Sequence, residues 1–174
     1  MTGKEVAPLS SPVHKLLLSS SVDKYVAAQC SLRKKNRRHI EGADLICYPP
    51  GSFYSSLMAN LLPSGVGQAV ANNDNPKVYI PNLGQDPEQL GMTMDRAVAT
   101  LLKRLRDDAG GKAGNEDLLN FVLMDSRNGA YASSLSTGRM ADLGVQIIDV
   151  PLITKRSAPF YDARRLVAAL LSLT

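Results

Sequence analysis

DLICYPPGSFYSSLMANLL, residues 44–62, decides the fold that the sequence predicts. An apolar run ends in Pro-Pro-Gly-Ser at 49–52, and a helical pattern starts directly afterwards, with Phe53, Leu57 and Leu61 at every fourth position. A β-strand that passes through a tight turn into a helix gives this pattern. Such a turn either only links the two elements or holds a phosphate, because the first amides of a helix lack partners within it.

Further apolar runs resemble the first one. They are continuous rather than alternating, which suits strands of a sheet that is covered on both faces. The predicted strands are Asp44–Tyr48, Lys77–Pro81, Asn120–Met124 and Val145–Val150, and a fifth is expected near Val13–Leu18. Because helical patterns separate these strands, the sequence predicts an α/β fold with a three-layer, Rossmann-like parallel sheet.

Helical patterns fill the intervals between the predicted strands. After the helix at 53–61, a clean apolar stripe covers 94–105 and the glycines at 110–111 end it. A shorter helix is expected at 135–143, and Asp162 is expected to cap the last one. Right-handed crossovers would place the carboxyl ends of all strands, and the loops that leave them, at one edge of the sheet. Ligands bind at that edge in such folds.

Composition fits one domain and limits the classes of partner. The chain has 174 residues, 44% of them hydrophobic, which is enough for a substantial core. The net charge is +4 and the pI about 9.1, and five cations lie between Arg33 and Arg38. This basic run is either a solvated helix face or a lid over an anionic ligand. Because no aromatic residues interleave with the cations, we do not expect nucleic-acid binding.

Cysteine, histidine and apolar patterns exclude further classes. Cys30 and Cys47 have no metal-ligand spacing, and we expect both to be reduced core residues. His14 and His39 are the only histidines and form no pair, so a zinc centre is not expected. Since no apolar run approaches a membrane span of about 18 residues and no apolar leader is present, we expect a soluble, cytoplasmic protein.

The Pro-Pro-Gly-Ser turn has the chemistry of a phosphate site. Gly51 allows close backbone approach, and Ser52 is expected to cap a helix that begins at Phe53. The amides at a helix start carry partial positive charge, and the hydroxyls of Ser55 and Ser56 would add donors. A capped turn without any ligand is the alternative. The motif is neither a Walker loop nor a nucleophile elbow, so a covalent serine is not expected.

Two stretches carry a family resemblance. ADLICYPPGSFYSSLMANLL at 43–62 is followed by PKVYIPNLGQDPEQLG at 76–91. They resemble the CofD-like family, whose pattern has a strand of the type ADLIVYGPGS, a helix S-L-Y-T-S with P-N-L-L, and a strand K-V-Y-V ending in Asn. That family contains the 2-phospho-L-lactate transferases of deazaflavin-coenzyme synthesis and the gluconeogenesis factors. The loop at 86–91 departs from the commoner family loop, which is typical of a CofD-related branch of unknown reaction.

The resemblance implies a nucleotide-dependent transferase that moves a phospholactyl-like group from a diphosphonucleoside carrier, with Mg²⁺. Asp125 would then reach the metal or a ribose, and a turn-forming aspartate is the alternative. The catalytic residues stay unknown. The implied nucleotide- and phosphate-binding residues are Gly51, Ser52, Phe53, Tyr54, Ser55, Ser56, Asn82, Lys155 and Arg156. For the last two, a solvent-exposed loop is the alternative.

The resemblance also implies a missing part. Family members are longer and begin with a strand that leads into a Gly-Gly-Gly-Thr-Gly loop, which this sequence lacks. We therefore expect 1–174 to form a single domain, the C-terminal half of a doubly wound one, in which Met1–Glu5 resembles an internal segment. The uncovered sheet face of such a half should promote self-association.

Two other functions stay open at this point. One is a non-catalytic, sugar-nucleotide-binding regulatory protein of the gluconeogenesis-factor type, and the other is an inactive truncated fragment. The expected partner is a GDP- or UDP-linked small molecule, with no membrane. A homo-oligomer or the missing N-terminal half is a further partner that the sequence leaves open.

Overall fold

The computed structural model describes residues 9–133 and 135–174, so the segment Met1–Glu5 lies outside the described residues. One four-stranded parallel sheet runs in the order β1-β2-β3-β4. The strands are β1 (Ile46–Tyr48), β2 (Lys77–Tyr79), β3 (Phe121–Met124) and β4 (Gln146–Asp149). All four predicted strands are confirmed, each shorter than expected. The fifth, expected at 13–18, is wrong, because that segment is irregular apart from a lone bridge beyond it at Ser19.

The helices include the four predicted ones in the predicted order, one of them different in type, together with a helix in the basic run and a short one at 66–71 that was not predicted. They are α1 (Lys34–Glu41), η1 (Phe53–Leu57), η2 (Met58–Leu61), α2 (Val66–Ala71), α3 (Met94–Asp108), α4 (Thr137–Asp142) and α5 (Ala163–Leu171). The predicted helix after Ser52 is a π turn followed by a 3₁₀ turn. The amides of Ser56 and Leu57 both donate to the carbonyl of Ser52, which widens the first turn. Among the described residues, no helix has the length and apolar character that a membrane crossing requires.

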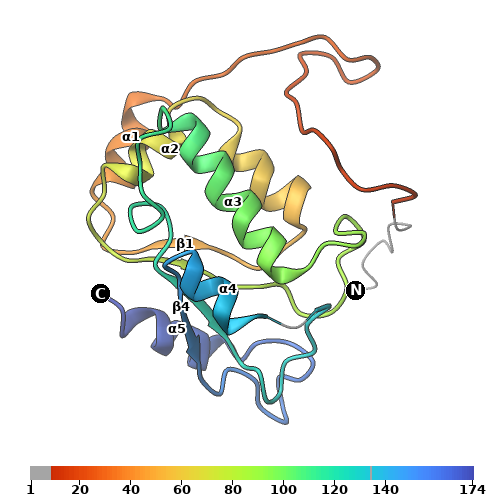
Figure 1. Cartoon of the computed structure of the whole chain (residues 1–174), viewed down its shortest axis with the longest axis vertical. Helices are drawn as coiled ribbons and strands as arrows, with labels where there is room; N and C mark the ends of the chain where they lie inside the picture. Colours follow the sequence, from red (N-terminus) through yellow and green to blue (C-terminus); the bar gives the residue numbers. More distant parts are fainter. Residues whose placement is uncertain (1–8, 134) are drawn as a thin grey trace.

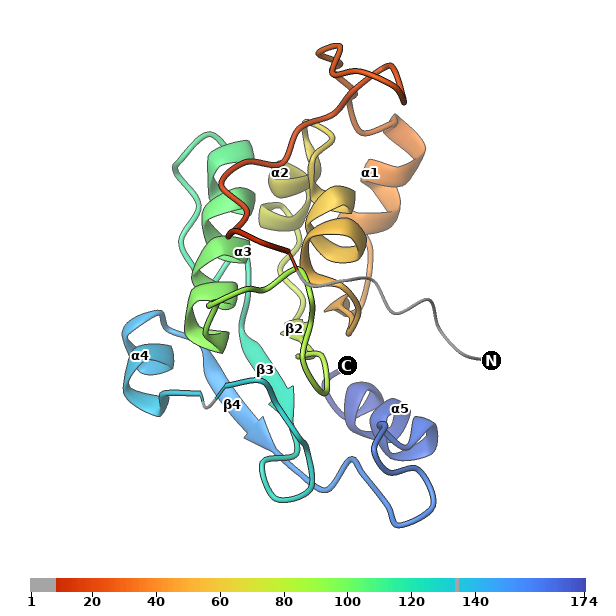
Figure 2. The same ribbon diagram turned by 90° about the vertical axis from the view of Figure 1, so that its right-hand side faces the viewer.

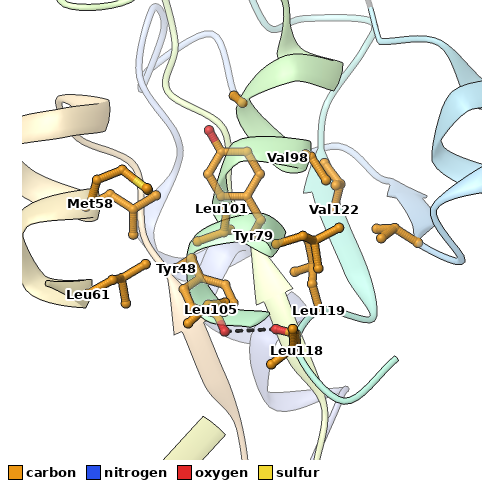
Figure 3. Close-up of a cluster of buried hydrophobic side chains, with 14 of the residues drawn as sticks. Tyr48, Met58, Leu61, Tyr79, Val98, Leu101, Leu105, Leu118, Leu119 and Val122 are labelled. Atoms are coloured by element: carbon orange, nitrogen blue, oxygen red, sulfur yellow. Dashed lines mark hydrogen bonds between the residues drawn. The ribbon is translucent and has the colours of Figure 1, made fainter. Parts of the chain in front are cut away.

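One face of the sheet carries the main core (Figure 3). The apolar stripe predicted on α3 lies against it, and Val98 and Leu101 are completely buried. Tyr48, from β1, is 3% exposed, and its hydroxyl donates to the carbonyl of Leu118 at 2.8 Å. Because all four strands are parallel, the loops that follow them lie together at the carboxyl edge of the sheet.

Among the helices of the described residues, α5 is the one that covers the opposite face, so the sheet lies between two unequal layers (Figures 1 and 2). The side of α5 away from the sheet is open, since Val167 and Leu171 are 53% and 65% exposed. Cys47 lies on β1, an edge strand, and is exposed, as is Cys30. The expectation that both cysteines are core residues is therefore wrong. The three-layer α/β prediction is confirmed.

Close packing of α2 on α3 depends on a glycine. A Cβ at Gly67 would overlap the carbonyl oxygen of Leu105 on α3. The Asp108 carboxylate, at the end of α3, accepts from the amides of Gly65 and Gly67, the latter at 2.6 Å. The two helices therefore meet backbone to backbone, with a carboxylate as the cap of α2.

We expect Gly67→Ala to destabilise the protein by about 1–3 kcal/mol, because the new methyl group must push α2 away from α3. Urea denaturation measures this as a lower midpoint. Gly138→Ala on α4 is the matched control, since the nearest atom to a Cβ there, the Ser136 hydroxyl oxygen, lies 4.0 Å away and alanine favours a helix by up to about 1 kcal/mol. Equal effects of the two changes would contradict the packing described for Gly67.

Candidate functional site

The loops that leave the four strands contact one another at the carboxyl edge of the sheet. The amide of Gly84, after β2, donates to the carbonyl of Ala130, after β3. The hydroxyl of Tyr161, after β4, donates to the carbonyl of Pro81 at 2.8 Å and lies 3.1 Å from the hydroxyl of Tyr131. This convergence was expected from the strand order, and it brings the polar loops into one region.

The amides at the start of η1 are bound by carboxylates of the chain itself. Phe53 donates its amide to the Asp86 carboxylate at 2.6 Å. Tyr54 and Ser55 donate theirs to one oxygen of Glu88, at 2.9 and 2.8 Å. The predicted Ser52 cap is wrong, because its side chain accepts none of these amides. Two residues from the loop after β2 form the cap instead.

Glu88 is held as an anion at this position. Burial raises the pKa of its carboxyl, but hydrogen bonds from Ser55 and Tyr54 lower it by more. The pKa of Glu88 therefore lies below the usual value. Asp86 is 7% exposed and also accepts the amide of Glu88 at 3.0 Å, which fixes the loop that carries both carboxylates. The row of amides therefore selects anions, and in this structure the anions are intramolecular.

Asp125 lies at the end of β3 and joins it to the loop after β4. It is 1% exposed, and one of its oxygens accepts the amides of Leu152 and Ile153, each at 2.9 Å. Both oxygens accept from the side chain of Asn128, and one also accepts its amide at 3.0 Å. Burial raises the pKa of Asp125, but these hydrogen bonds lower it more.

This arrangement tests whether Asp125 fits a Mg²⁺ ion. Carboxylate ligands of Mg²⁺ present a free lone pair to the metal. Both oxygens of Asp125 already accept two or more donors, so the residue does not fit a metal ligand without rearrangement of two loops. The described residues also contain no group of three or more histidine, cysteine or acidic side chains that could hold a metal. We therefore derive no step through a metal.

A pocket of about 430 Å³ lies at the carboxyl ends of β3 and β4. The hydroxyl-bearing residues Ser126, Tyr131 and Thr137 line it, together with Asp149. Asp149 accepts both the amide of Ser126, at 2.9 Å, and its hydroxyl. Hydroxyls and a carboxylate are the groups that hydrogen-bond to the hydroxyls of a sugar. We refer to this cavity as the edge pocket.

The other predicted site residues are more scattered. Asn82 is half-buried at the end of β2 and lines a small cavity of about 20 Å³. Lys155 and Arg156 are exposed in the loop before α5 and line neither this cavity nor the edge pocket. The basic run begins α1, beside α2, with Arg37 within 3.8 Å of Glu41. The roles of Asn82, Lys155 and Arg156 in nucleotide binding stay predictions.

Sequence reasoning did not assign the residues that organise this edge. Asp86, Glu88 and Asp149 received no role, although the 86–91 loop stood out as a departure from the family pattern. The hydroxyls of Tyr131 and Tyr161 were also missed. Each of these residues acts on a partner more than 20 positions away in the chain, so no local spacing indicates it.

We expect Asp125→Asn to lower the free energy of unfolding by about 3 kcal/mol at pH 7, because a buried charged acceptor is lost. The folded-state pKa of Asp125 is depressed, so its stabilisation is complete above its unfolded pKa of about 4 and is lost as the pH falls through the lower folded value. The difference between wild type and variant should therefore shrink below about pH 4. Urea titrations at several pH values measure it.

Asp142→Asn, at an exposed position on α4, is the matched control for charge removal. It should leave stability nearly unchanged at every pH. A difference for Asp125→Asn that stayed constant down to pH 2 would argue against an ionised Asp125 in the folded state.

Comparison with known proteins identifies the family. The family model described as 2-phospho-L-lactate transferase CofD matches residues 10–153. A putative gluconeogenesis factor of Thermotoga maritima is 34% identical over 88 residues, which cover 51% of this chain and 25% of that protein. The gluconeogenesis factor of Bacillus subtilis is 38% identical over 71 residues, covering 41% and 22%. That of Listeria monocytogenes is 30% identical over 114 residues, covering 63% and 34%.

Solved structures show the same fold. Two crystal structures of a UPF0052-family protein from Bacillus halodurans match with TM-scores of 0.64 and 0.61 at 22% identity. The match covers 81% of this chain and 47% of that one. The chain thus spans about half of the solved relative and a smaller share of the curated ones. Because the family model matches most of its length, the chain belongs to the CofD and gluconeogenesis-factor family.

Proposed function

We propose that this chain binds a nucleotide-linked, negatively charged small molecule at the carboxyl edge of the sheet, as a non-catalytic regulatory protein of the gluconeogenesis-factor type. The observation that carries the proposal is the row of amides at Phe53, Tyr54 and Ser55, which already holds carboxylate oxygens. A phosphate offers the same oxygens with more charge, so it can replace Glu88 at the amides of Tyr54 and Ser55. Next to these amides in the chain are Gly51, whose φ is +156°, Ser52 and Ser56.

The end of the ligand that does not carry the phosphate would lie nearer β3 and β4. The edge pocket offers hydroxyls and the Asp149 carboxylate, which suit the ribose or sugar of a GDP- or UDP-linked compound. Asn82, at the end of β2, lies between the two parts in strand order. Lys155 and Arg156 would neutralise phosphate charge if their exposed loop closes over the ligand. The names of the gluconeogenesis-factor relatives support this regulatory candidate.

A transferase of the 2-phospho-L-lactate type is the second candidate, and the family-model match supports it. Such an enzyme moves a phospholactyl-like group from a guanosine diphosphate carrier to an alcohol, so the P–O bond to GMP breaks and a P–O bond to the acceptor forms. The reaction needs a base for the alcohol proton and neutralisation of the charge on the diphosphate. Among the described carboxylates at the edge, Asp86, Glu88 and Asp125 are engaged with amides. This engagement favours binding without turnover.

Isothermal titration with GDP and with a UDP-sugar, each with and without Mg²⁺, tests the proposal. We expect saturable binding, and Glu88→Gln should raise the affinity roughly tenfold, because a neutral side chain competes less well for the amides. Glu116→Gln, at an exposed position before β3, is the control and should change nothing. Absence of binding, or weaker binding by Glu88→Gln, would overturn the anion site at Phe53–Ser55. Release of GMP from the guanosine carrier would instead support the transferase.

A further inference from the structure

A third cavity, with a volume of about 840 Å³, lies along α3 on the side away from the sheet. Its walls are α3 and the continuous η1–η2 segment, and the N-terminal stretch 12–16 lies across it, in the red part of the chain in Figure 2. We call this cavity the α3 groove. Its volume is within the range of about 300–1,000 Å³ that small-molecule sites occupy. No role has been assigned to it above.

One wall of the α3 groove is apolar. Tyr54, Met58 and Leu62 recur at every fourth position along η1 and η2, so that their side chains line the same side. Leu16 and Met92 add apolar surface from the N-terminal stretch and from the loop before α3. A ring or a hydrocarbon chain of about 10 Å would lie along this wall, which corresponds to two turns of helix.

The facing wall is cationic. Arg96, Thr100 and Lys103 repeat along one face of α3, and Lys15 reaches the groove from the N-terminal stretch. Lys103 pairs with Asp107. Arg104 donates to the carbonyls of Leu61 and Leu62, each at 2.9 Å, and thereby caps η2.

Arg96 and Lys15 are the cations that remain for a ligand. Within the described part of the chain neither forms an ion pair, and the remaining acid of the groove, Glu88, is bound to the η1 amides. Arg96 and Tyr54 line the same groove. Burial raises the pKa of the Tyr54 phenol, and the charge of Arg96 acts on it in the opposite direction. The positive end of the groove therefore lies next to an aromatic ring.

We propose that the α3 groove binds one amphipathic anion, with an aromatic or apolar body on Tyr54, Met58 and Leu62 and an anionic group at Arg96 and Lys15. Charge complementarity selects the anion, and the apolar wall selects the body. A groove closed on one side by the N-terminal stretch suits a small molecule. The inference does not require nucleotide binding, because the groove ligand would contact the side chains of Tyr54, Arg96 and Lys15, whereas the proposed phosphate site consists of main-chain amides.

The test uses 1-anilinonaphthalene-8-sulfonate, an aromatic compound with one sulfonate, and follows its fluorescence on titration with the full chain. We expect saturable binding of one molecule per chain. The double variant Lys15→Gln with Arg96→Gln should weaken it about tenfold, whereas Lys112→Gln with Arg139→Gln, an equal loss of charge at exposed positions outside the groove, should not. Urea midpoints equal to that of the wild type verify that both double variants are folded.

N-phenyl-1-naphthylamine, which lacks the sulfonate, is the matched probe. Its binding should be weaker than that of the sulfonate and should not respond to the Lys15 and Arg96 changes. Equal loss in both double variants, no saturable binding, or binding that neither double variant affects would overturn the proposal. The last outcome would locate the probe on another apolar surface, such as the exposed side of α5 with Val167 and Leu171. No nucleotide is present, so the result is separate from the test of the carboxyl edge.

Discussion

Contacts between carboxylates and main-chain amides hold the functional edge of this protein together. Loops that leave parallel strands contain amides without partners in the sheet, and a buried amide without a partner costs about 1–3 kcal/mol. Asp86 and Glu88 pair the amides that begin η1, and Asp125 pairs those of Leu152 and Ile153. Each contact joins the ends of two different strands. Away from this edge, the Asp108 carboxylate pairs the amides of Gly65 and Gly67 at the start of α2 in the same way.

The same contacts limit the chemistry of the edge. A carboxylate that accepts two or three amides is a poor base, since its lone pairs are in use and its pKa is lowered, as for Asp125 and Glu88. It is also a poor metal ligand. An amide that holds a carboxylate is different, because a stronger oxyanion can exchange with it. The edge is therefore better suited to bind an anion than to transfer a proton.

The sequence predicts the elements well and their connections poorly. Strand and helix positions depend on local periodicity, so continuous apolar runs at β2 and β3 and the stripe on α3 were recognisable. Caps inside one turn were recognisable as well: Asp162 accepts the amides of Arg164 and Arg165, as predicted. The cap of η1 comes from Asp86 and Glu88, more than 30 positions away, and only tertiary structure brings it there. Ser52 had the right residue type but lost this competition to stronger, charged acceptors.

Glu88 connects the two proposed sites. Its carboxylate binds the η1 amides, and its side chain also lines the α3 groove beside Tyr54. The amide of Leu9 donates to the carbonyl of Pro87, the residue before Glu88. The N-terminal stretch that crosses the groove is therefore bound to the loop that carries Glu88. An anion that replaces Glu88 must move this carboxylate, because two like charges cannot share the amides. The displaced side chain could turn into the groove that it already lines, where Arg96 would attract it. Occupancy of the edge should therefore change the charge that a ligand in the groove meets, and by linkage the reverse must also hold.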